Sequence, residues 1–368
     1  MKKNILTAML CLTAGALLFT GCNKKKTENI SRPTVRLLTD ATGIDDTSFN
    51  AAAWRGILEF YGDSIGNEKG RGVLYDVITS QTQDMYVPNL KQAADKGYDL
   101  IIGCGFTFAD AIAEVAAEYP DQNFMIVDVD WLNDSKNLAQ YVYNEEQGSF
   151  LVGAVAALQA KADGIEKPKF GFIGGVPGAT ITKFEVGYIQ GIRAVMPDAA
   201  IVDYYANSWS APEKAKAQAK NWYDSGVCTI FSAAGGTGNG TIAQAKEYRV
   251  QGKNIWAIGV DSDQWEAGKY AEGKSVVLTS MVKKVETAAL MALKGIEEGQ
   301  FQSGVHKLTL ADGGLDYALT NTELKPEVVK AVNEMKNDII SGKIKVVGTY
   351  KAALEAGLVP EGLGAKDD

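Results

Sequence analysis

Histidine is almost absent from this sequence, which contains only His306 among its 368 residues. A zinc site built from several histidines is therefore improbable, as is a Ser-His-Asp triad with its histidine elsewhere in the chain. The ligand spacing of a calcium-binding loop is absent too. Aspartate and glutamate are plentiful, 45 together. A hydrolase that works through two paired carboxylates therefore stays open.

Cysteine is scarce, with four in the chain. Cys11 and Cys22 belong to the amino-terminal leader and its end. Cys104 and Cys228 lie in apolar runs typical of strands. We therefore expect two buried free thiols there rather than a disulfide.

Long apolar runs are missing after the amino terminus, so the sequence predicts no transmembrane helix there. The net charge of -8 gives no reason to expect nucleic acid as a partner. The length after the leader is sufficient for two domains, each with its own core.

The amino terminus has the form of a secretory leader. Lys2 and Lys3 precede a mostly apolar run from Ile5 to Phe19, which is too short to span a bilayer comfortably. Small residues just before Cys22 resemble a bacterial lipoprotein signal, in which that cysteine carries the lipid; the alternative is an ordinary secretory leader. We expect a signal peptide at residues 1–21 and a flexible, lipidated tether at 22–33. The predicted location is the extracytoplasmic side of the cell membrane.

Strand-like and helix-like segments alternate through the rest of the chain. This order predicts an α/β fold, in which parallel sheets are flanked by helices. Two successive sets of alternation predict two similar lobes, and Lys307–Leu319 is expected to form a hairpin. The predicted first lobe is 34–143, joined by about 281–318, and the second is 144–280, joined by about 319–368. A cleft between two lobes suits a hinge-closing binding protein and would also suit a two-domain enzyme.

The stretch from Asp40 to Asn50 is the most informative loop. It follows the predicted strand Thr34–Thr39 and precedes a helix that begins near Phe49. It carries three carboxylates, three hydroxyls, an aromatic ring and an amide. Ligands bind at the carboxyl ends of strands in open α/β sheets, so this loop is a candidate binding site. The alternative is a capped helix start, with Asp46, Thr47 or Ser48 as the N-cap.

Other predicted strands also end in glycines or acids. The glycine-rich stretches 174–178 and 233–240 lack the lysine of a phosphate loop and do not fit the dinucleotide fingerprint. Acids follow two strands, as the pairs Asp128 with Asp130 and Asp261 with Asp263. They suit hydrogen bonds from the hydroxyls of a sugar. A metal site and solvated surface acids are the alternatives, and we expect the second for Asp130 and Asp263.

Taken together, several stretches resemble the basic membrane protein family of bacterial lipoproteins, the substrate-binding components of ABC importers. The matching stretches are Asp40–Asn50 with Trp54 and Gly56, Gly171–Gly175, Lys183–Tyr188 with Gly191, Ala234–Gly238, Gly259–Gln264, and Leu278–Ser280 with Lys283. They span most of the chain after the leader. The resemblance implies a two-lobed type I periplasmic-binding-protein fold. The chain is also similar to the purine nucleoside receptors of that family, which bind nucleosides in the cleft.

The resemblance also implies roles for particular residues. Asp40 and Asn50 would bond the base, and Phe49 and Phe184 would stack on it. Near the ribose would lie Asp128, Gly236, Asp261 and Lys283. Alternatively, the two phenylalanines are core residues of their helices, and Lys283 is a solvated lysine at a helix start.

The sequence thus gives two functional hypotheses. The first is a lipid-anchored, monomeric nucleoside-binding protein that has no cofactor, is not an enzyme, and delivers its ligand to an ABC transporter permease. The second is a secreted carboxylate-dependent hydrolase that acts on nucleosides or glycosides.

Overall fold

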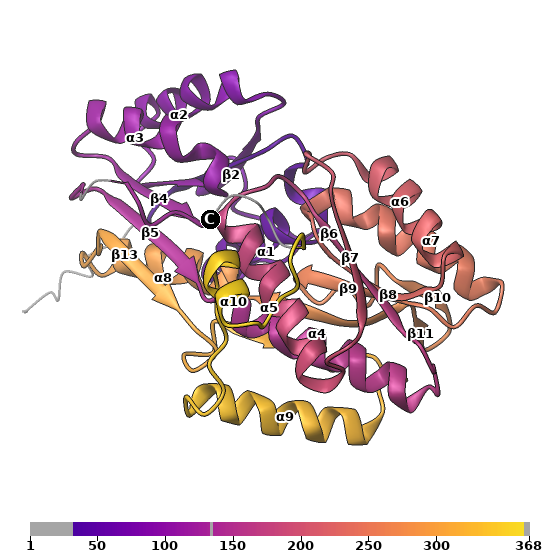
Figure 1. The fold of residues 1–368 in the computed structure, drawn as a ribbon. Helices are drawn as coiled ribbons and strands as arrows, with labels where there is room; N and C mark the ends of the chain where they lie inside the picture. Colours follow the sequence, from indigo (N-terminus) through magenta and orange to yellow (C-terminus); the bar gives the residue numbers. More distant parts are fainter. Residues whose placement is uncertain (1–31, 133–134, 364–368) are drawn as a thin grey trace, which may run out of the picture. The chain divides into compact units, whose positions relative to one another are not determined.

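The computed structural model describes residues 32–132 and 135–363. The predicted signal peptide, the lipidated Cys22 and most of the predicted tether lie outside the described residues. The described residues form two six-stranded sheets, coloured along the chain in Figure 1. A small antiparallel ribbon of β10 (Lys269–Ala271) and β11 (Lys274–Ser275) adds to them.

The first sheet has the strand order β13-β5-β4-β3-β1-β2, and all its strand pairs are parallel. Its strands are β1 (Val35–Thr39), β2 (Tyr75–Thr79), β3 (Leu100–Gly103), β4 (Asn123–Val127), β5 (Leu138–Tyr143) and β13 (Gly304–Leu308). β1, β3 and β5 are buried along their whole length. Their near-continuous apolar sequences are typical of parallel strands that are covered on both faces.

The second sheet repeats this arrangement, in the order β14-β12-β9-β8-β6-β7. Its strands are β6 (Lys169–Gly174), β7 (Ala200–Tyr205), β8 (Val227–Ala233), β9 (Trp256–Asp261), β12 (Val277–Lys283) and β14 (Leu315–Tyr317). Only β14 runs antiparallel to its neighbour, β12. The prediction of an α/β fold with parallel sheets is confirmed.

Helices cover the faces of both sheets. They are α1 (Phe49–Tyr61), α2 (Tyr86–Asp95), α3 (Ala109–Glu118), α4 (Glu145–Ala162), α5 (Ala179–Val195), α6 (Pro212–Asp224), α7 (Asn239–Val250), α8 (Val285–Glu297), α9 (Pro326–Ile340) and α10 (Tyr350–Glu355). α2 and α3 share one apolar cluster with the first sheet, and α6 and α7 share another with the second. α1 packs on α8, α4 packs on α5, and α9 lies along α4 (Figure 1).

The predicted hairpin at Lys307–Leu319 is wrong. β13 pairs in parallel with β5 in the first sheet, whereas β14 pairs with β12 in the second. Each strand completes the open edge of a different sheet, so the connection between them crosses from one sheet to the other. Within the described residues the chain crosses between the sheets three times, after β5, after β12 and after β13. The lobe boundaries given above stay a prediction.

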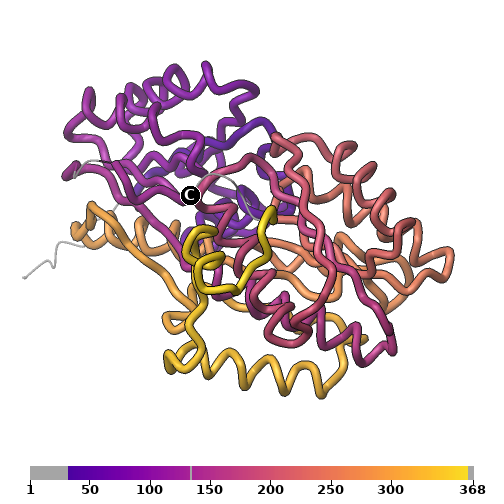
Figure 2. The backbone as a smooth tube through the Cα atoms, viewed as in Figure 1, coloured from indigo at the N-terminus to yellow at the C-terminus, as the bar shows by residue number. Residues whose placement is uncertain are grey.

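The chain after α9 returns to α5, as the yellow trace in Figure 2 shows. The side-chain amide of Gln190 donates to the carbonyl of Val347 at 2.8 Å and accepts from its N–H at 3.0 Å. Ala353 and Val359 pack against Val186 and Ile189 of α5. The carboxyl-terminal segment is therefore part of the packed structure.

Two close helix crossings depend on glycine. A Cβ atom at Gly56 of α1 would lie 2.4 Å from the carbonyl oxygen of Glu286 in α8. A Cβ atom at Gly187 of α5 would lie 2.4 Å from the carbonyl oxygen of Glu146 in α4. Backbone atoms cannot rotate away as a flexible side chain can, so each position excludes any larger residue.

We predict that Gly56→Ala destabilises the protein. Alanine in a helix gains roughly 1 kcal/mol over glycine, but overpacking of a close contact costs roughly 1–3 kcal/mol. The clash involves backbone, so we expect the second effect to be larger and the free energy of unfolding in urea to fall. Glu59→Ala, at an exposed position of the same helix, is the control. A Gly56→Ala protein as stable as the wild type would contradict the prediction.

Candidate functional site

A cavity lies at the carboxyl ends of strands from both sheets. Its residues follow or end β1, β3, β4, β8, β9 and β12, and its empty volume is about 570 Å³, open solvent at the mouth included. All the residues predicted to bind a ligand line it: Asp40, Phe49, Asn50, Asp128, Phe184, Gly236, Asp261 and Lys283. The structure therefore brings the whole predicted set together.

The two acids at strand ends occupy matching places in the two sheets. Asp128 follows β4 and Asp261 ends β9, and each of these strands is third from one edge of its sheet. Both residues have left-handed backbone, with φ of 68° and 62°. Such conformations are uncommon outside glycine and cluster at functional sites. In contrast, Asp130 and Asp263 are exposed and do not line the cavity.

Lys283 is fully buried at the cavity wall and is held by two carboxylates. Its ammonium bonds the carboxylate of Asp128 and lies 2.9 Å from Oε1 of Glu145. Burial disfavours the charged lysine, but Asp128 and Glu145 outweigh it and raise the pKa of Lys283 above its ordinary value. Lys283 is therefore a charged, anchored donor, and the alternative of a solvated lysine is wrong.

The carboxylates around Lys283 differ in their electrostatics. Burial raises the pKa of Glu145, but the ammonium groups of Lys283 and Lys183 outweigh it and lower that pKa. For Asp128, burial dominates over Lys283 and raises the pKa. Burial also raises the pKa of Asp261 to about 7, against the opposing effects of Lys283 and of a 2.8 Å bond from Ser48 Oγ. The cavity wall thus combines one fixed cation with acids that resist ionisation.

Asp40 and Asn50 form a second polar group in the cavity. Nδ2 of Asn50 donates to Oδ1 of Asp40 at 3.1 Å, and the N–H of Thr42 donates to the same oxygen at 3.0 Å. Oδ1 of Asn50 is buried and has no hydrogen-bond partner among the described residues. A buried acceptor without a partner is costly, so this atom is suited to a ligand that carries an N–H or O–H donor.

The same loop also caps α1. Oδ1 of Asp46 accepts from the N–H groups of Ser48 and Ala51, at 3.0 and 2.9 Å, and Oδ2 accepts from the N–H of Asn50 at 2.7 Å. Burial raises the pKa of Asp46 to about 6 against these bonds. The alternative interpretation of the loop as a capped helix start is therefore correct, but the N-cap residue is Ser48 and the capping bonds go to the carboxylate of Asp46. The capped turn fixes the start of α1, which begins with Phe49 and Asn50.

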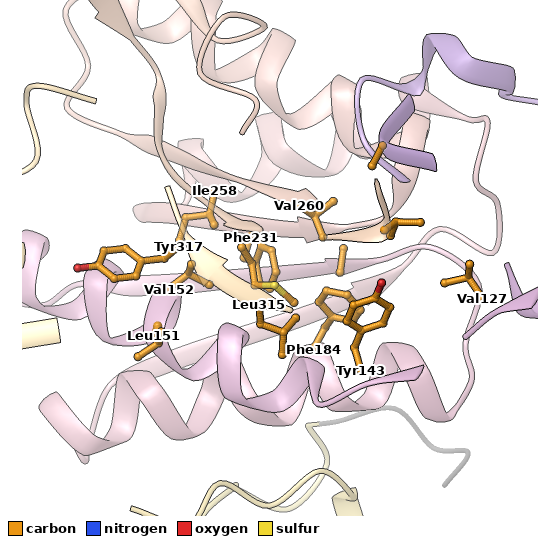
Figure 3. Close-up of a cluster of buried hydrophobic side chains, with 14 of the residues drawn as sticks. Val127, Tyr143, Leu151, Val152, Phe184, Phe231, Ile258, Val260, Leu315 and Tyr317 are labelled. Atoms are coloured by element: carbon orange, nitrogen blue, oxygen red, sulfur yellow. The ribbon is translucent and has the colours of Figure 1, made fainter. Parts of the chain in front are cut away.

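Aromatic rings from both halves of the chain line the cavity. The Lys283 ammonium lies 5.1 Å from the ring centre of Phe49 and 5.5 Å from that of Phe184. Phe184 also belongs to the buried cluster shown in Figure 3, where its ring centre is 6.3 Å from that of Phe231. It is therefore both a core residue and part of the cavity wall. Phe49 is less deeply buried.

Sequence reasoning missed Phe106 and Trp209 in the cavity wall. Their rings meet edge to face, with centres 5.8 Å apart. Each follows a predicted strand, so the rule that selected the Asp40 loop could have found both. The glycines of the second half explain the position of Trp209, because a Cβ at Gly175 would lie 2.1 Å from its ring. These glycines allow close packing rather than phosphate binding.

Hydrogen bonds join the loop before α1 to the loops of the second sheet. Nη2 of Arg55 donates to Oγ of Ser262 at 2.6 Å, and that hydroxyl donates to the carbonyl of Ser48 at 2.9 Å. Nδ2 of Asn239 donates to the carbonyl of Asp46 at 3.2 Å. The two halves of the cavity are therefore held against each other.

Residues 32–132 and 135–363 contain no group of three side chains suited to a metal ion. Cys104 and Cys228 are buried and free, so the prediction for these two thiols is confirmed.

Comparison with known proteins identifies the family of this chain. The family model described as "ABC transporter substrate-binding protein PnrA-like" matches residues 34–349. The chain belongs to this family. Its members are substrate-binding proteins rather than enzymes, so the hydrolase hypothesis is wrong and the predicted non-enzymatic role is confirmed. The resemblance found in the sequence is confirmed as well.

Relatives of similar length support this assignment. A "CD4+ T-cell-stimulating antigen" of Listeria innocua is 37% identical and covers 94% of this chain and 98% of its own. The "ABC transporter nucleoside-binding protein BmpA" of Lactococcus lactis is 34% identical and covers 94% and 99%. A solved ABC transporter solute-binding protein from Aeropyrum pernix K1 is 26% identical, with a TM-score of 0.75 over 89% of this chain and 98% of its own. The type I periplasmic-binding-protein fold is confirmed.

The pKa of Asp261 generates a prediction about stability and pH. The folded pKa is about 7 and the ordinary value is 3.8, so between these values the folded protein binds more protons than the unfolded chain. Stability contributed by this group is therefore fully present below pH 3.8 and is lost as pH rises towards 7. Asp261→Asn removes this titration. We expect the variant to gain stability relative to the wild type across that window, by up to about 1.4 kcal/mol per pH unit.

Urea unfolding of the unliganded proteins at several pH values measures this difference. Asp263→Asn, two residues away and exposed, is the control for loss of a carboxylate outside the cavity. A constant or falling difference for Asp261→Asn would show that Asp261 is ionised in the folded protein throughout this range.

Proposed function

We propose that this substrate-binding protein captures purine nucleosides in the cavity and delivers them to the permease of an ABC importer. The observation that carries the proposal is the convergence of eight predicted ligand-binding residues on one cavity. The relative named as a nucleoside-binding protein covers nearly the whole chain.

The base occupies the part of the cavity formed by Asp40, Asn50 and the aromatic rings. The ring centres of Phe49 and Phe184 lie 5.1 and 5.5 Å from the ammonium of Lys283. The two rings come from helices that follow strands of different sheets. A planar base stacks between such rings, and the strength of this stacking depends little on which base it is. The unpartnered Oδ1 of Asn50 and the carboxylate of Asp40 accept hydrogen bonds from N–H groups on the edge of the base.

The ribose lies beside Lys283. An ammonium has three N–H donors, and Asp128 and Glu145 account for two of them among the described residues. The third is available to a hydroxyl oxygen of the sugar. Asp128 and Asp261 accept from ribose hydroxyls, and Gly236, which also lines the cavity, presents its backbone to the sugar.

Release and capture require the two halves of the cavity to separate. We propose that the three connections after β5, β12 and β13 act as the hinge, because they are the places where the chain crosses between the sheets. The predicted lobe boundaries fit such a hinge. Hinge closure around a ligand is a common motion of periplasmic binding proteins.

We further propose that lipid on Cys22 anchors the protein, as a monomer, on the extracytoplasmic side of the membrane. In the part of the chain that the structure describes, no helix has the length and hydropathy needed to span a bilayer. The lipoprotein-like signal that ends at Cys22 supports an anchor of the covalent kind.

Calorimetric titration with nucleosides tests the binding function. We expect purine nucleosides to bind with one site per chain and without release of free base. Phe49→Ala removes a stacking contact worth roughly 1–3 kcal/mol and should weaken binding about ten- to a hundredfold. Trp131→Ala, which removes an aromatic ring that is 58% exposed and outside the cavity lining, is the control. Nucleoside affinity that is unchanged by Phe49→Ala would contradict the stacking role.

Replacement of Cys22 tests the anchor. Cys22→Ser cannot carry the lipid, so we expect the protein to move from the membrane fraction to the soluble fraction when cells are fractionated. Cys228→Ser changes a buried thiol of the folded part and should leave the protein with the membranes. Retention of the Cys22→Ser protein on membranes would refute lipid anchoring at this residue.

A further inference from the structure

Of the described acids that act on Lys283, namely Asp128, Asp261 and Glu145, Glu145 is the one that does not line the cavity. Asp128 and Asp261 act on the ammonium from the cavity wall. Glu145 is 1% exposed and contacts the same ammonium at 2.9 Å from outside the lining. The ammonium is therefore held between acids in the wall and one acid behind it.

Glu145 is itself held in place. Its Oε2 lies 3.3 Å from Nζ of Lys183, and that ammonium donates to the carbonyl of Tyr143 at 3.1 Å. Glu145 is also the first residue of α4, where the free N–H groups and the dipole of the helix favour a negative charge. Its position therefore depends on fixed neighbours and not on a ligand.

Lys283 needs such a partner because its side chain is long and flexible. Four rotatable bonds separate its ammonium from the backbone, and both carboxylates of the wall attract it towards the ligand space. The ammonium already bonds Asp128, so without Glu145 the attraction of Asp261 would turn it further into the region where ligand hydroxyls bind. With Glu145, one N–H is turned away from the cavity and the remaining donors keep a fixed direction.

The contact between Glu145 and Lys283 also joins two of the segments that cross between the sheets. Glu145 lies at the start of the connection that follows β5, and Lys283 is the last residue of β12, directly before the connection that contains α8. A contact between these two segments lies at the predicted hinge, where relative movement of the two halves is small. Asp128 belongs to the first sheet, so its distance from Lys283 changes if the halves separate.

We infer that Glu145 is a positioning residue that holds the ammonium of Lys283 in its ligand-binding direction through opening and closing. It touches no ligand and acts through Lys283 alone. This inference rests on the proposed function, in which Lys283 binds the ribose.

Calorimetry with a purine ribonucleoside and with its free base tests the inference. Glu145→Gln should lower the affinity for the nucleoside by at least about tenfold, the effect of losing a well-placed hydrogen bond from a charged donor. It should change the affinity for the free base by less than about threefold, since the free base lacks the hydroxyl that accepts from Lys283. Equal losses for both ligands, or no loss for either, would overturn the inference.

Glu146→Gln is the matched control. Glu146 is the next residue of the same helix and is also buried, but it forms no ion pair with Lys283. Both affinities should stay within about threefold of the wild type. If Glu145→Gln does not fold, Lys183→Met can replace it, because it removes the outer partner of Glu145. This variant should also lose affinity for the nucleoside but not for the free base, by a smaller factor.

A measurement without ligand separates this inference from the proposed function. NMR of the protein labelled at its lysine side chains reports the environment of the Lys283 ammonium at neutral pH. Loss of the Glu145 charge should shift the Lys283 signal, while Glu146→Gln leaves it unchanged. A wild type that binds no nucleoside would refute the proposed function, whereas an unchanged Lys283 signal in Glu145→Gln would refute the role of Glu145.

Discussion

The buried ammonium of Lys283 is the interaction on which the rest of the site depends. A lone charge at that depth would be strongly unfavourable, and it is stable only because Asp128 and Glu145 contact it. These partners come from the first sheet and from α4, while Lys283 ends β12 of the second sheet. The cation therefore links the two halves at the place where the cavity forms, and among the described residues it is the one cationic side chain in an otherwise acidic cavity lining.

In both halves, two helices cross closely at a glycine. Gly56 lies on the backbone of Glu286, and Gly187 lies on the backbone of Glu146; a Cβ atom at either glycine would lie 2.4 Å from the facing carbonyl oxygen. The left-handed residues Asp128 and Asp261 also occupy matching strands. Because the two halves share these features, similar loops lie on both sides of the cavity. The differences between the halves, above all the lysine at the end of β12, then give the cavity its polarity.

Much of this arrangement could be predicted from sequence, because strand ends are local features. Asp40 and Asp261 were found by their position after apolar runs, and the resemblance to a family selected among such candidates. Glu145 was missed because its importance depends on a residue 138 positions away, and no local pattern signals that contact. The hairpin before Leu319 was wrong for a similar reason. Two adjacent strands do not reveal that each completes a different sheet.

A crystal structure of the protein with a bound purine ribonucleoside tests the central claim most directly. We expect a ribose hydroxyl oxygen within hydrogen-bond distance of Nζ of Lys283, a second hydroxyl bonded to Asp261, and the base between the rings of Phe49 and Phe184. Asn50 Oδ1 should accept from the edge of the base. A nucleoside bound outside this cavity, or one whose base contacts Lys283 while its ribose lies against Asn50, would contradict it.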